Sequence, residues 1–321
     1  MLLQVVLLVV GLVLLIKGAD WLVDGSSGIA KYFGVSPMFI GLTIVAFGTS
    51  APELAVSVSA SLKGSSALAI SNVVGSNIAN TALVLGITSM IIPLAVQKNT
   101  IRKELPFNIL ITVVFFAMLM RNGSFSIDRW DGIVLFVLLV IFIEYTFVMA
   151  LNDRKLTLQP ELKKKQENKD KKIIIKNSIF TIIGLVMVVY GADLTVNSAT
   201  KIALAMGISE ALVGLSMVAL GTSLPELVTS ISAAMKKEID LAVGNIVGSN
   251  VFNILLIIGF SSVVNPLKVN VDSYWIDLTY LLGLAIFLWI FSATKKKIQR
   301  WEGCILFASY IAYMIFIMFR G

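Results

Sequence analysis

Histidine is absent from the 321-residue sequence, and cysteine occurs once, at Cys304. Without histidine the chain lacks the commonest proton shuttle and soft-metal ligand. A single cysteine excludes an internal disulfide framework and a metal–thiolate site. Charged residues make up only 14% of the sequence, fewer than in a typical soluble domain. These absences leave oxygen ligands, which suit hard cations such as Ca²⁺, Mg²⁺ and Na⁺.

Apolar residues are abundant instead: the sequence is 57% hydrophobic and its mean hydropathy is +0.91. Apolar runs of about twenty residues, long enough to cross a bilayer core, recur along the whole chain. The net charge of +7 does not indicate nucleic-acid binding, because the charges lie between apolar runs and not on one basic face. We predict an all-α integral membrane protein with ten spans, at residues 2–24, 37–61, 67–93, 105–120, 131–151, 177–198, 210–234, 240–263, 274–293 and 302–319.

One long polar segment, residues 152–176, separates two blocks of five predicted spans. We therefore predict an N-terminal five-helix repeat over 1–151, a solvated linker, and a C-terminal five-helix repeat over 177–321. If the N-terminus lies outside, 19 of the 26 lysines and arginines fall on the same side as the linker. The positive-inside rule then predicts a multi-pass cell-membrane protein with a cytoplasmic linker and both termini outside.

The two halves carry the same motifs at a constant offset of 173 residues. Residues 41–54, which contain Gly-Thr-Ser-Ala-Pro-Glu, return at 214–227, and residues 72–80 return at 245–253. The offset indicates an internal duplication, and an odd number of spans in each copy inverts the second copy in the membrane. That plan is typical of secondary transporters, whose sites lie near the bilayer midplane between the repeats. The repeated cores cover about 37–94 and about 210–267.

Each copy places a glutamate directly after a proline in the middle of an apolar span, at Glu53 and Glu226. Proline breaks the helix before it and frees carbonyl groups, which protein or a water-filled cavity must satisfy in a membrane. The carbonyl oxygens that we expect to become available belong to the regions of Ala46, Thr49, Ala219 and Thr222. An ionised carboxylate at this depth requires a cation partner or a proton. The alternative is structural, because Ser50 and Ser223 precede the glutamates at the spacing of a capping box.

The second repeated motif is Gly-Ser-Asn-x-x-Asn. Ser76 and Asn80 are four residues apart, on one helical face, as are Ser249 and Asn253. Hydroxyl and amide oxygens complete hard-cation sites that already hold negative charge, so we predict that these four side chains are ligands. Helix packing is the alternative, and it is the interpretation that we favour for Asn77 and Asn250. A further repeated pair, Asp20 and Asp193, lies near the ends of spans, where capping or pairing with loop groups is expected.

These motifs resemble the repeats of the cation/Ca²⁺ exchanger superfamily, and most closely those of the compact microbial sodium/calcium exchangers. The resemblance implies a secondary active antiporter, not an enzyme, that exchanges Ca²⁺ for Na⁺ by alternating access, with the first and sixth spans sliding as a gate. It also implies that Glu53 and Glu226 ligate Ca²⁺ with the carbonyls of Thr49 and Thr222. The Na⁺ sites would be completed by Ser50, Ser76, Ser223 and Ser249, with Asn80 and Asn253 at the centre.

The sequence departs from some relatives, which carry aspartate at one of the two central asparagine positions. The fixed charge of the site is therefore only −2, which disfavours K⁺ co-transport. A Ca²⁺/H⁺ exchanger remains an alternative because two protons would also neutralise the glutamate pair, and a passive cation channel is a less favoured one. Ca²⁺ and Na⁺ are the expected substrates in a lipid bilayer; no cofactor, nucleic acid or obligatory protein partner is expected.

Overall fold

The computed structural model describes residues 2–121, 125–157, 171–207, 219–269 and 271–320. Within these residues the regular secondary structure is helical apart from four strands of two residues each. Helices follow from the apolar runs, because backbone groups in a bilayer must find hydrogen-bond partners within their own segment. The N-terminal half contains α1 (Leu2–Phe33), α2 (Pro37–Ile40), the π-helical turn η1 (Gly41–Val45), α3 (Ala46–Thr49), α4 (Ala51–Leu62), α5 (Ser66–Ile78), η2 (Ala79–Val84), α6 (Leu85–Ile91), β1 (Leu94–Ala95), η3 (Thr100–Glu104), α7 (Leu105–Met120), β2 (Ser126–Ile127) and α8 (Arg129–Thr157).

The C-terminal half repeats much of this order. It contains α10 (Lys171–Ala205), α12 (Ala219–Thr222), α13 (Leu224–Met235), α14 (Ile239–Phe252), η5 (Asn253–Ile258), α15 (Gly259–Val264), β3 (Leu267–Lys268), α16 (Val271–Lys295), β4 (Lys297–Ile298) and α17 (Arg300–Arg320). Eight helices of the described residues are long and apolar enough to cross a membrane, and the bent unit from α2 to α4 makes up to nine. The predicted span 210–234 begins among residues 208–218, which lie outside the described residues.

Two helices extend beyond the spans predicted for them. α1 and α10 contain 32 and 35 residues, whereas spans 2–24 and 177–198 were expected. The segment 152–176 is helical at both ends, since α8 continues to Thr157 and α10 begins at Lys171; residues 158–170 lie outside the described residues. Hydropathy locates the apolar part of a helix, but the hydrogen-bonded backbone continues into water, where charged side chains are tolerated.

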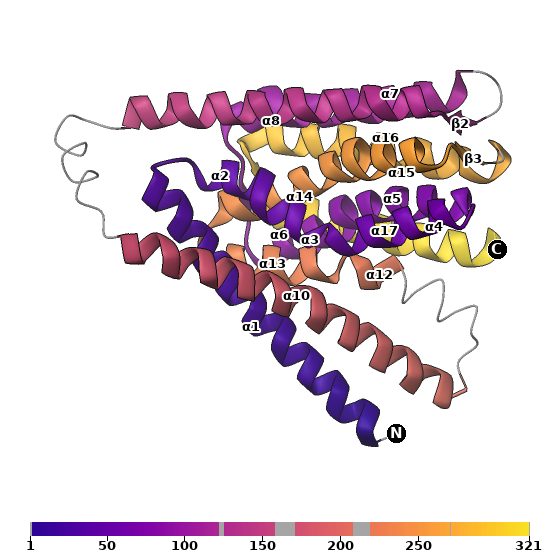
Figure 1. The fold of residues 1–321 in the computed structure, drawn as a ribbon, viewed down its shortest axis with the longest axis horizontal. Helices are drawn as coiled ribbons and strands as arrows, with labels where there is room; N and C mark the ends of the chain where they lie inside the picture. The colour runs from indigo at the N-terminus through magenta and orange to yellow at the C-terminus, as the bar shows by residue number, and fades with distance from the viewer. Residues whose placement is uncertain (1, 122–124, 158–170, 208–218, 270, 321) are drawn as a thin grey trace.

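α1 and α10 lie side by side and slant away from the remaining helices (Figure 1). Their contact depends on glycines of both helices. A Cβ added at Gly18 would lie 2.8 Å from the backbone nitrogen of Val188 and 2.9 Å from the carbonyl oxygen of Gly184. Likewise, a Cβ at Gly191 would lie 2.6 Å from the backbone nitrogen of Leu15. The two backbones therefore approach as closely as small-residue packing in membranes allows, which makes α1 and α10 a tight pair.

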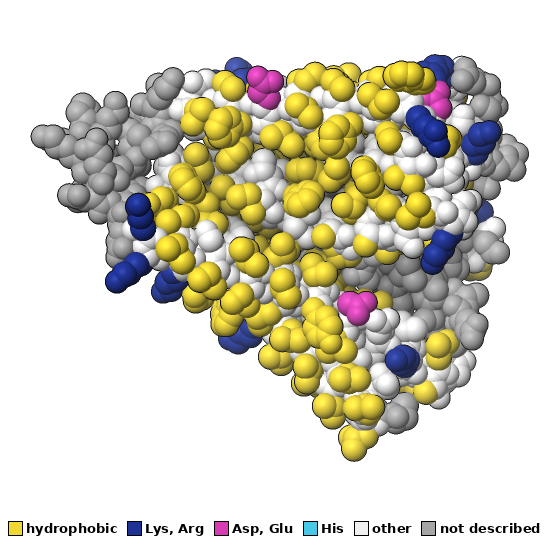
Figure 2. All heavy atoms as spheres, viewed as in Figure 1, with side chains coloured by type: hydrophobic (Ala, Val, Ile, Leu, Met, Phe, Trp, Pro, Cys, Tyr) yellow, Lys and Arg dark blue, Asp and Glu magenta, His cyan; other side chains and the backbone are white. Residues whose placement is uncertain are grey.

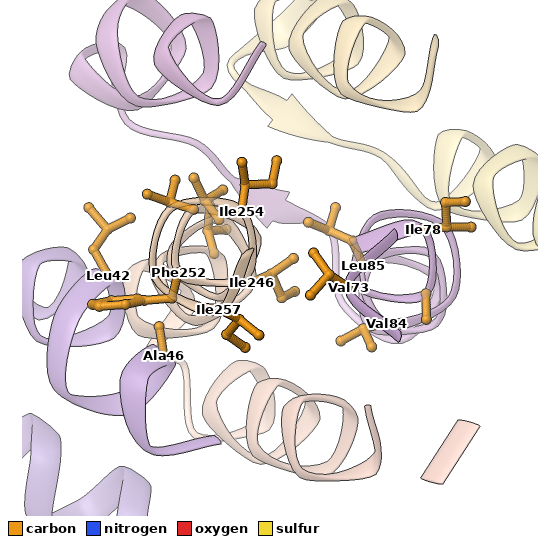
Figure 3. Close-up of a cluster of buried hydrophobic side chains, with 14 of the residues drawn as sticks. Leu42, Ala46, Val73, Ile78, Val84, Leu85, Ile246, Phe252, Ile254 and Ile257 are labelled. Carbon is orange, nitrogen blue, oxygen red and sulfur yellow. The ribbon is translucent and has the colours of Figure 1, made fainter. Parts of the chain in front are cut away.

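The centre of the protein is formed by the broken helices. In the most apolar 18-residue stretch of each span, 94% of the residues are buried from α14 to α15 and 78% from α5 to α6, whereas the shares are 22% in α1 and 17% in α10. Figure 3 shows Ile246 of α14 facing Val73 of α5, with Leu42 and Ala46 beside Phe252. Hydrophobic side chains cover the middle of the face shown in Figure 2, and most charged ones lie towards the ends of the helices.

Two strand pairs connect the halves of the chain. β1 pairs with β4 through Leu94 and Ile298, and β2 pairs with β3 through Ser126 and Lys268, both antiparallel. β1 and β3 start at residues 94 and 267, which differ by the same offset of 173 as the sequence motifs. The two halves are thus joined by two short antiparallel ladders, each of which takes one strand from each half.

The α1–α10 packing can be tested at Gly18. A methyl group there would also lie 2.7 Å from Met187 Cβ, so Gly18→Ala should force the helices apart and destabilise the protein by about 1–3 kcal/mol. Gly283→Ala in α16 is the matched control, because nothing lies within 4 Å of its added Cβ. Thermal unfolding in detergent should show a lower midpoint for Gly18→Ala alone. An equal fall for both variants would contradict the close packing of α1 on α10.

Candidate functional site

Both glutamates lie in the first turn of a helix that begins at a break in the apolar segment. α3 and α4 meet at Ser50, whose φ and ψ are −82° and 7°, and the unit bends by 47° there. α12 and α13 meet at Ser223 with nearly the same φ and ψ, −89° and 1°. Pro52 and Pro225 occupy the first turn of the new helix, where the missing N–H loses no intrahelical hydrogen bond. The predicted breaks are therefore present, and each places a carboxylate at the positive end of a helix dipole.

Glu226 is fully buried and accepts hydrogen bonds from both halves of the chain. Its Oε1 accepts from Ser50 Oγ at 3.2 Å and from Ser249 Oγ at 3.3 Å. Its Oε2 has no donor among the described residues. The break in the first half thus supplies a hydroxyl to the glutamate of the second half, and one carboxylate oxygen is left for another positive partner.

Glu53 has a closely similar setting and is also fully buried. Its Oε1 accepts from Ser76 Oγ at 3.4 Å, and that hydroxyl lies 3.4 Å from Thr222 Oγ1 of the second half. The other oxygen, Oε2, has no donor within the described part of the chain. The Oγ of Ser223, at the second break, is likewise buried without a partner there.

Asn80 and Asn253 lie in the π-helical turns η2 and η5, which interrupt the two most buried spans. Such turns are frequent at functional sites because they shift the side-chain register of a helix. Asn253 Nδ2 donates to Asn77 Oδ1 at 2.9 Å, while Asn253 Oδ1 and both amide atoms of Asn80 have no partner among the described residues. Asn77 Nδ2 donates to the carbonyl of Asn250, its own counterpart at the offset of 173, at 3.2 Å. The asparagines expected to pack helices therefore do so, beside two central amides.

The predicted backbone ligands differ in how far they are engaged. The carbonyl of Ala46 accepts from the Ser50 N–H at 3.0 Å and from Thr49 Oγ1 at 3.4 Å. The single proton of Thr49 Oγ1 is shared with Asn245 Oδ1, which at 3.1 Å is the nearer acceptor and fixes the first break against α14. At Ala219 only the backbone, at the start of α12, is described.

The capping-box alternative is wrong at both breaks. Neither Ser50 nor Ser223 makes a side-chain cap hydrogen bond, although each is the N-cap of its helix. In a capping box the glutamate side chain accepts a hydrogen bond from the N–H of the N-cap residue. The N–H of Ser50 donates instead to the carbonyl of Ala46. The glutamates are therefore not held in the role of closing a helix end.

Glu53 and Glu226 repel each other in a buried site, and neither forms an ion pair with a described residue. No group of three or more histidine, cysteine, aspartate or glutamate side chains lies together in the described part of the chain. A metal ion at this site would thus find two carboxylates surrounded by hydroxyl and amide oxygens. That donor set suits Ca²⁺ and Na⁺ and is poorly suited to soft transition metals.

Sequence reasoning missed two supporting asparagines. Asn72 Nδ2 donates to the Glu53 carbonyl at 3.1 Å and to Ser57 Oγ at 2.8 Å, which ties α5 to the glutamate helix α4. Asn245 Nδ2 makes the equivalent bond to Ser230 Oγ at 3.1 Å, from α14 to α13. Both asparagines and both serines recur at the offset of 173, a signal that was available in the sequence.

A cavity of 790 Å³ lies between α10 and the first break. It is lined by Pro52 of α4, by Asp193 and Asn197 of α10 and by Thr222. The hydroxyl of Thr222 lies 3.4 Å from that of Ser76, which donates to Glu53. The other repeated aspartate, Asp20, is paired as predicted with a residue at a helix end, Lys236. The cavity therefore reaches the edge of the candidate site from one side.

The comparisons with known proteins agree with this geometry. The sequence model of the family described as "Sodium/calcium exchanger protein" matches residues 3–148 and 176–319. The chain is 37% identical to the putative antiporter CaxA of Alkalimonas amylolytica and 32% identical to the sodium/calcium exchanger MaX1 of Methanosarcina acetivorans, with 98% of each chain covered in both cases. A solved structure of the sodium–calcium exchanger NCX_Mj, soaked with 10 mM Na⁺ and zero Ca²⁺, matches with a TM-score of 0.85 at 34% identity over 98% of both chains.

Matches of this length cover both glutamate breaks and both asparagine motifs, together with nearly all of the apolar helices. They establish a multi-pass membrane protein and a cation/Ca²⁺ antiporter. The chain belongs to the sodium/calcium exchanger family.

Proposed function

We propose that the protein exchanges Ca²⁺ for Na⁺ by alternating access through the site at Glu53 and Glu226. The observation that carries the proposal is a pair of buried carboxylates with no basic partner among the described residues, bonded by hydroxyls from both halves. Two relatives whose names specify sodium/calcium exchange match almost the full chain and favour Na⁺ as the counter-ion. In this account the ions are substrates, and no cofactor or catalytic residue takes part.

The ligands divide by charge. Ca²⁺ takes the two glutamate carboxylates and nearby carbonyl oxygens, because a divalent ion gains most from formal charge. Na⁺ takes sites in which one carboxylate is shared with hydroxyls. The proposed ion ligands are the side chains of Glu53, Glu226, Ser50, Ser223, Ser76, Ser249, Asn80 and Asn253 and the carbonyls of Thr49, Thr222, Ala46 and Ala219.

Electrostatics then couples the two ions. The empty site holds a charge of about −2 in a desolvated setting, one Ca²⁺ neutralises it, and three Na⁺ leave it near +1. The switch between the inward-facing and outward-facing states costs the most free energy when the site is empty, so the carrier makes this switch only when ions are bound. This requirement produces exchange and prevents a leak.

We further propose ten spans arranged as two inverted repeats of five, over 1–151 and 177–321. The equivalent breaks at Ser50 and Ser223, the strand pairs shared between the halves and the contact of Asn77 with its own counterpart support this arrangement. In the inverted plan, a residue near the pseudo-twofold axis lies next to its own copy, as Asn77 and Asn250 do.

The proposed orientation in the cell membrane has both termini outside and the 152–176 segment in the cytoplasm. A Cys304→Ser background removes the single cysteine and permits site-directed labelling. Lys268→Cys should react with a membrane-impermeant maleimide on intact cells, whereas Lys98→Cys should react only after permeabilisation. The opposite pattern would reverse the proposed orientation.

The counter-ion is tested by Ca²⁺ uptake into proteoliposomes. An outward Na⁺ gradient at equal pH should drive uptake, because Na⁺ leaving the vesicle is exchanged for Ca²⁺. A pH gradient without Na⁺ should drive none above protein-free vesicles. Uptake driven by the pH gradient alone would favour the Ca²⁺/H⁺ alternative, in which two protons replace Na⁺ on the same glutamates.

The site itself is tested by Glu53→Gln and Glu226→Gln. Each variant removes half of the fixed charge while keeping the shape, so Na⁺-driven Ca²⁺ uptake should fall to the level of protein-free vesicles. Glu302→Gln is a matched control, since Glu302 is also fully buried in the first turn of a helix, where its Oε2 accepts the Gln299 N–H at 2.7 Å. Normal uptake by either site variant, with the protein still folded, would remove that glutamate from the proposed site.

A further inference from the structure

Lys236 ties the end of α13 to α1. Its Nζ lies 2.7 Å from Asp24 Oδ1 and 3.6 Å from Asp20 Oδ1, and it donates to the Asp20 carbonyl at 2.9 Å. Ser232 Oγ, one turn earlier in α13, donates to Asp20 Oδ1 at 2.8 Å. Four polar contacts therefore converge on one turn of α1.

A second cluster continues the contact along α1. Glu238, in the turn before α14, accepts from Ser27 Oγ at 2.5 Å and from Lys31 Nζ at 2.9 Å. Partial burial raises the pKa of Glu238, but these two hydrogen bonds and the positive charge of Lys31 outweigh burial and leave the pKa below its ordinary value. The contacts of Asp20, Asp24, Ser27 and Lys31 with Ser232, Lys236 and Glu238 are called the α1 latch below.

The α1 residues of the latch follow one another at intervals of four, three and four, which is the spacing of a single helical face. α1 packs along α13 through this face. The α1 latch is therefore an extended polar seam between one helix of the tight α1–α10 pair and the helix that carries Glu226.

The offset of 173 gives this seam a counterpart in the other half. Asp20 corresponds to Asp193, Ser232 to Ser59 and Lys236 to Lys63. These counterparts are apart: Asp193 lines the 790 Å³ cavity that separates α10 from α4, and Ser59 and Lys63 are exposed. Neither Asp193 nor Lys63 forms an ion pair with a described residue. The same three residue types are thus joined at one glutamate helix and separated at the other.

We propose that Asp193, Ser59 and Lys63 form a second latch, between α10 and α4, that closes when the α1 latch opens. The inference rests on the proposed alternating access and names the contacts that hold each of its two end states. The glycine contacts keep α1 and α10 together, so a shift of the pair that brings α10 onto α4 carries α1 off α13. The residues of both latches act as positioning residues, since none belongs to the proposed ion ligands.

The two latches are unequal. Asp24 of the α1 latch corresponds to Asn197, Lys31 to Leu204 and Glu238 to Ser65, so two of the three ion pairs have no equivalent in the second latch. Exposed ion pairs are individually weak, but several in one seam bias an equilibrium between two states. The equilibrium between the two states therefore favours the one with the α1 latch closed and the cavity beside α10 open, as in this structure.

Disulfide trapping tests the alternation. In the Cys304→Ser background, one variant carries Asp20→Cys with Ser232→Cys and the other carries Asp193→Cys with Ser59→Cys. Both are oxidised in proteoliposomes under Na⁺ and Ca²⁺ gradients of either direction. The cysteines at positions 20 and 232 should form a disulfide in the absence of a gradient. The cysteines at positions 193 and 59 should form one under the gradient that lowers the yield of the first disulfide. Each disulfide should stop Ca²⁺ uptake, and reduction should restore it.

Failure of the second pair to form under every gradient, in protein that still transports Ca²⁺, would overturn the second latch and leave the proposed function intact. Formation of both disulfides in the same molecule of a four-cysteine chain would overturn the alternation. Absence of Na⁺-driven uptake in the wild-type chain would instead count against the proposed function.

The bias between the latches is tested by removing one charge. Lys236→Met should raise the yield of the second disulfide relative to the first by at least about fivefold, because the α1 latch loses two of its three ion pairs and keeps only that of Lys31 with Glu238. Lys63→Met, the counterpart at the same offset, should change the ratio in the opposite direction, and Lys236→Arg should leave it near the wild-type value. An unchanged ratio in Lys236→Met would overturn the proposal.

Discussion

Two fully buried carboxylates that share one site without a basic partner among the described residues are the constraint on which the structure depends. Such a pair is costly in a membrane unless cations or protons neutralise it. The breaks before the glutamates, the serines bonded to the carboxylates and the amides of the two π-helical turns surround this pair with neutral oxygen donors. No donor in the described part of the chain removes the negative charge, and that charge remains available to a transported ion.

The other features divide into a buried core and a more exposed helix pair, which is the part that the proposed alternating access would move. The spans from α5 to α6 and from α14 to α15 are largely buried, and Asn72 and Asn245 fix them to the glutamate helices. α1 and α10 are instead packed tightly on each other and only at one side on the core. A stiff site beside a tight helix pair is the arrangement that alternating access requires, because the binding oxygens stay in register while the cover moves.

The sequence located the helix breaks and the polar motifs better than the ends of the helices. Proline before glutamate implied both breaks, and the repeated offset identified the serine and asparagine motifs, because these depend on local covalent geometry and on residue type. Hydropathy misplaced the ends of α1 and α10, since it measures the apolar part of a helix and is insensitive to its continuation in water. The donation of Ser50 to Glu226, and not to the glutamate three residues later, required the two halves to be placed in space. The π-helical turns at Asn80 and Asn253 have no residue signature that distinguishes them from an α-helix.

A crystal structure of the protein soaked with Sr²⁺ in place of Ca²⁺ tests the central claim most directly, because strontium is located by its anomalous scattering. The account predicts one strong peak between the Glu53 and Glu226 carboxylates, within coordination distance of both, and loss of that peak in Glu53→Gln. Carboxylates found bonded to lysine or arginine, or a peak that lies elsewhere while the glutamate site holds none, would contradict it.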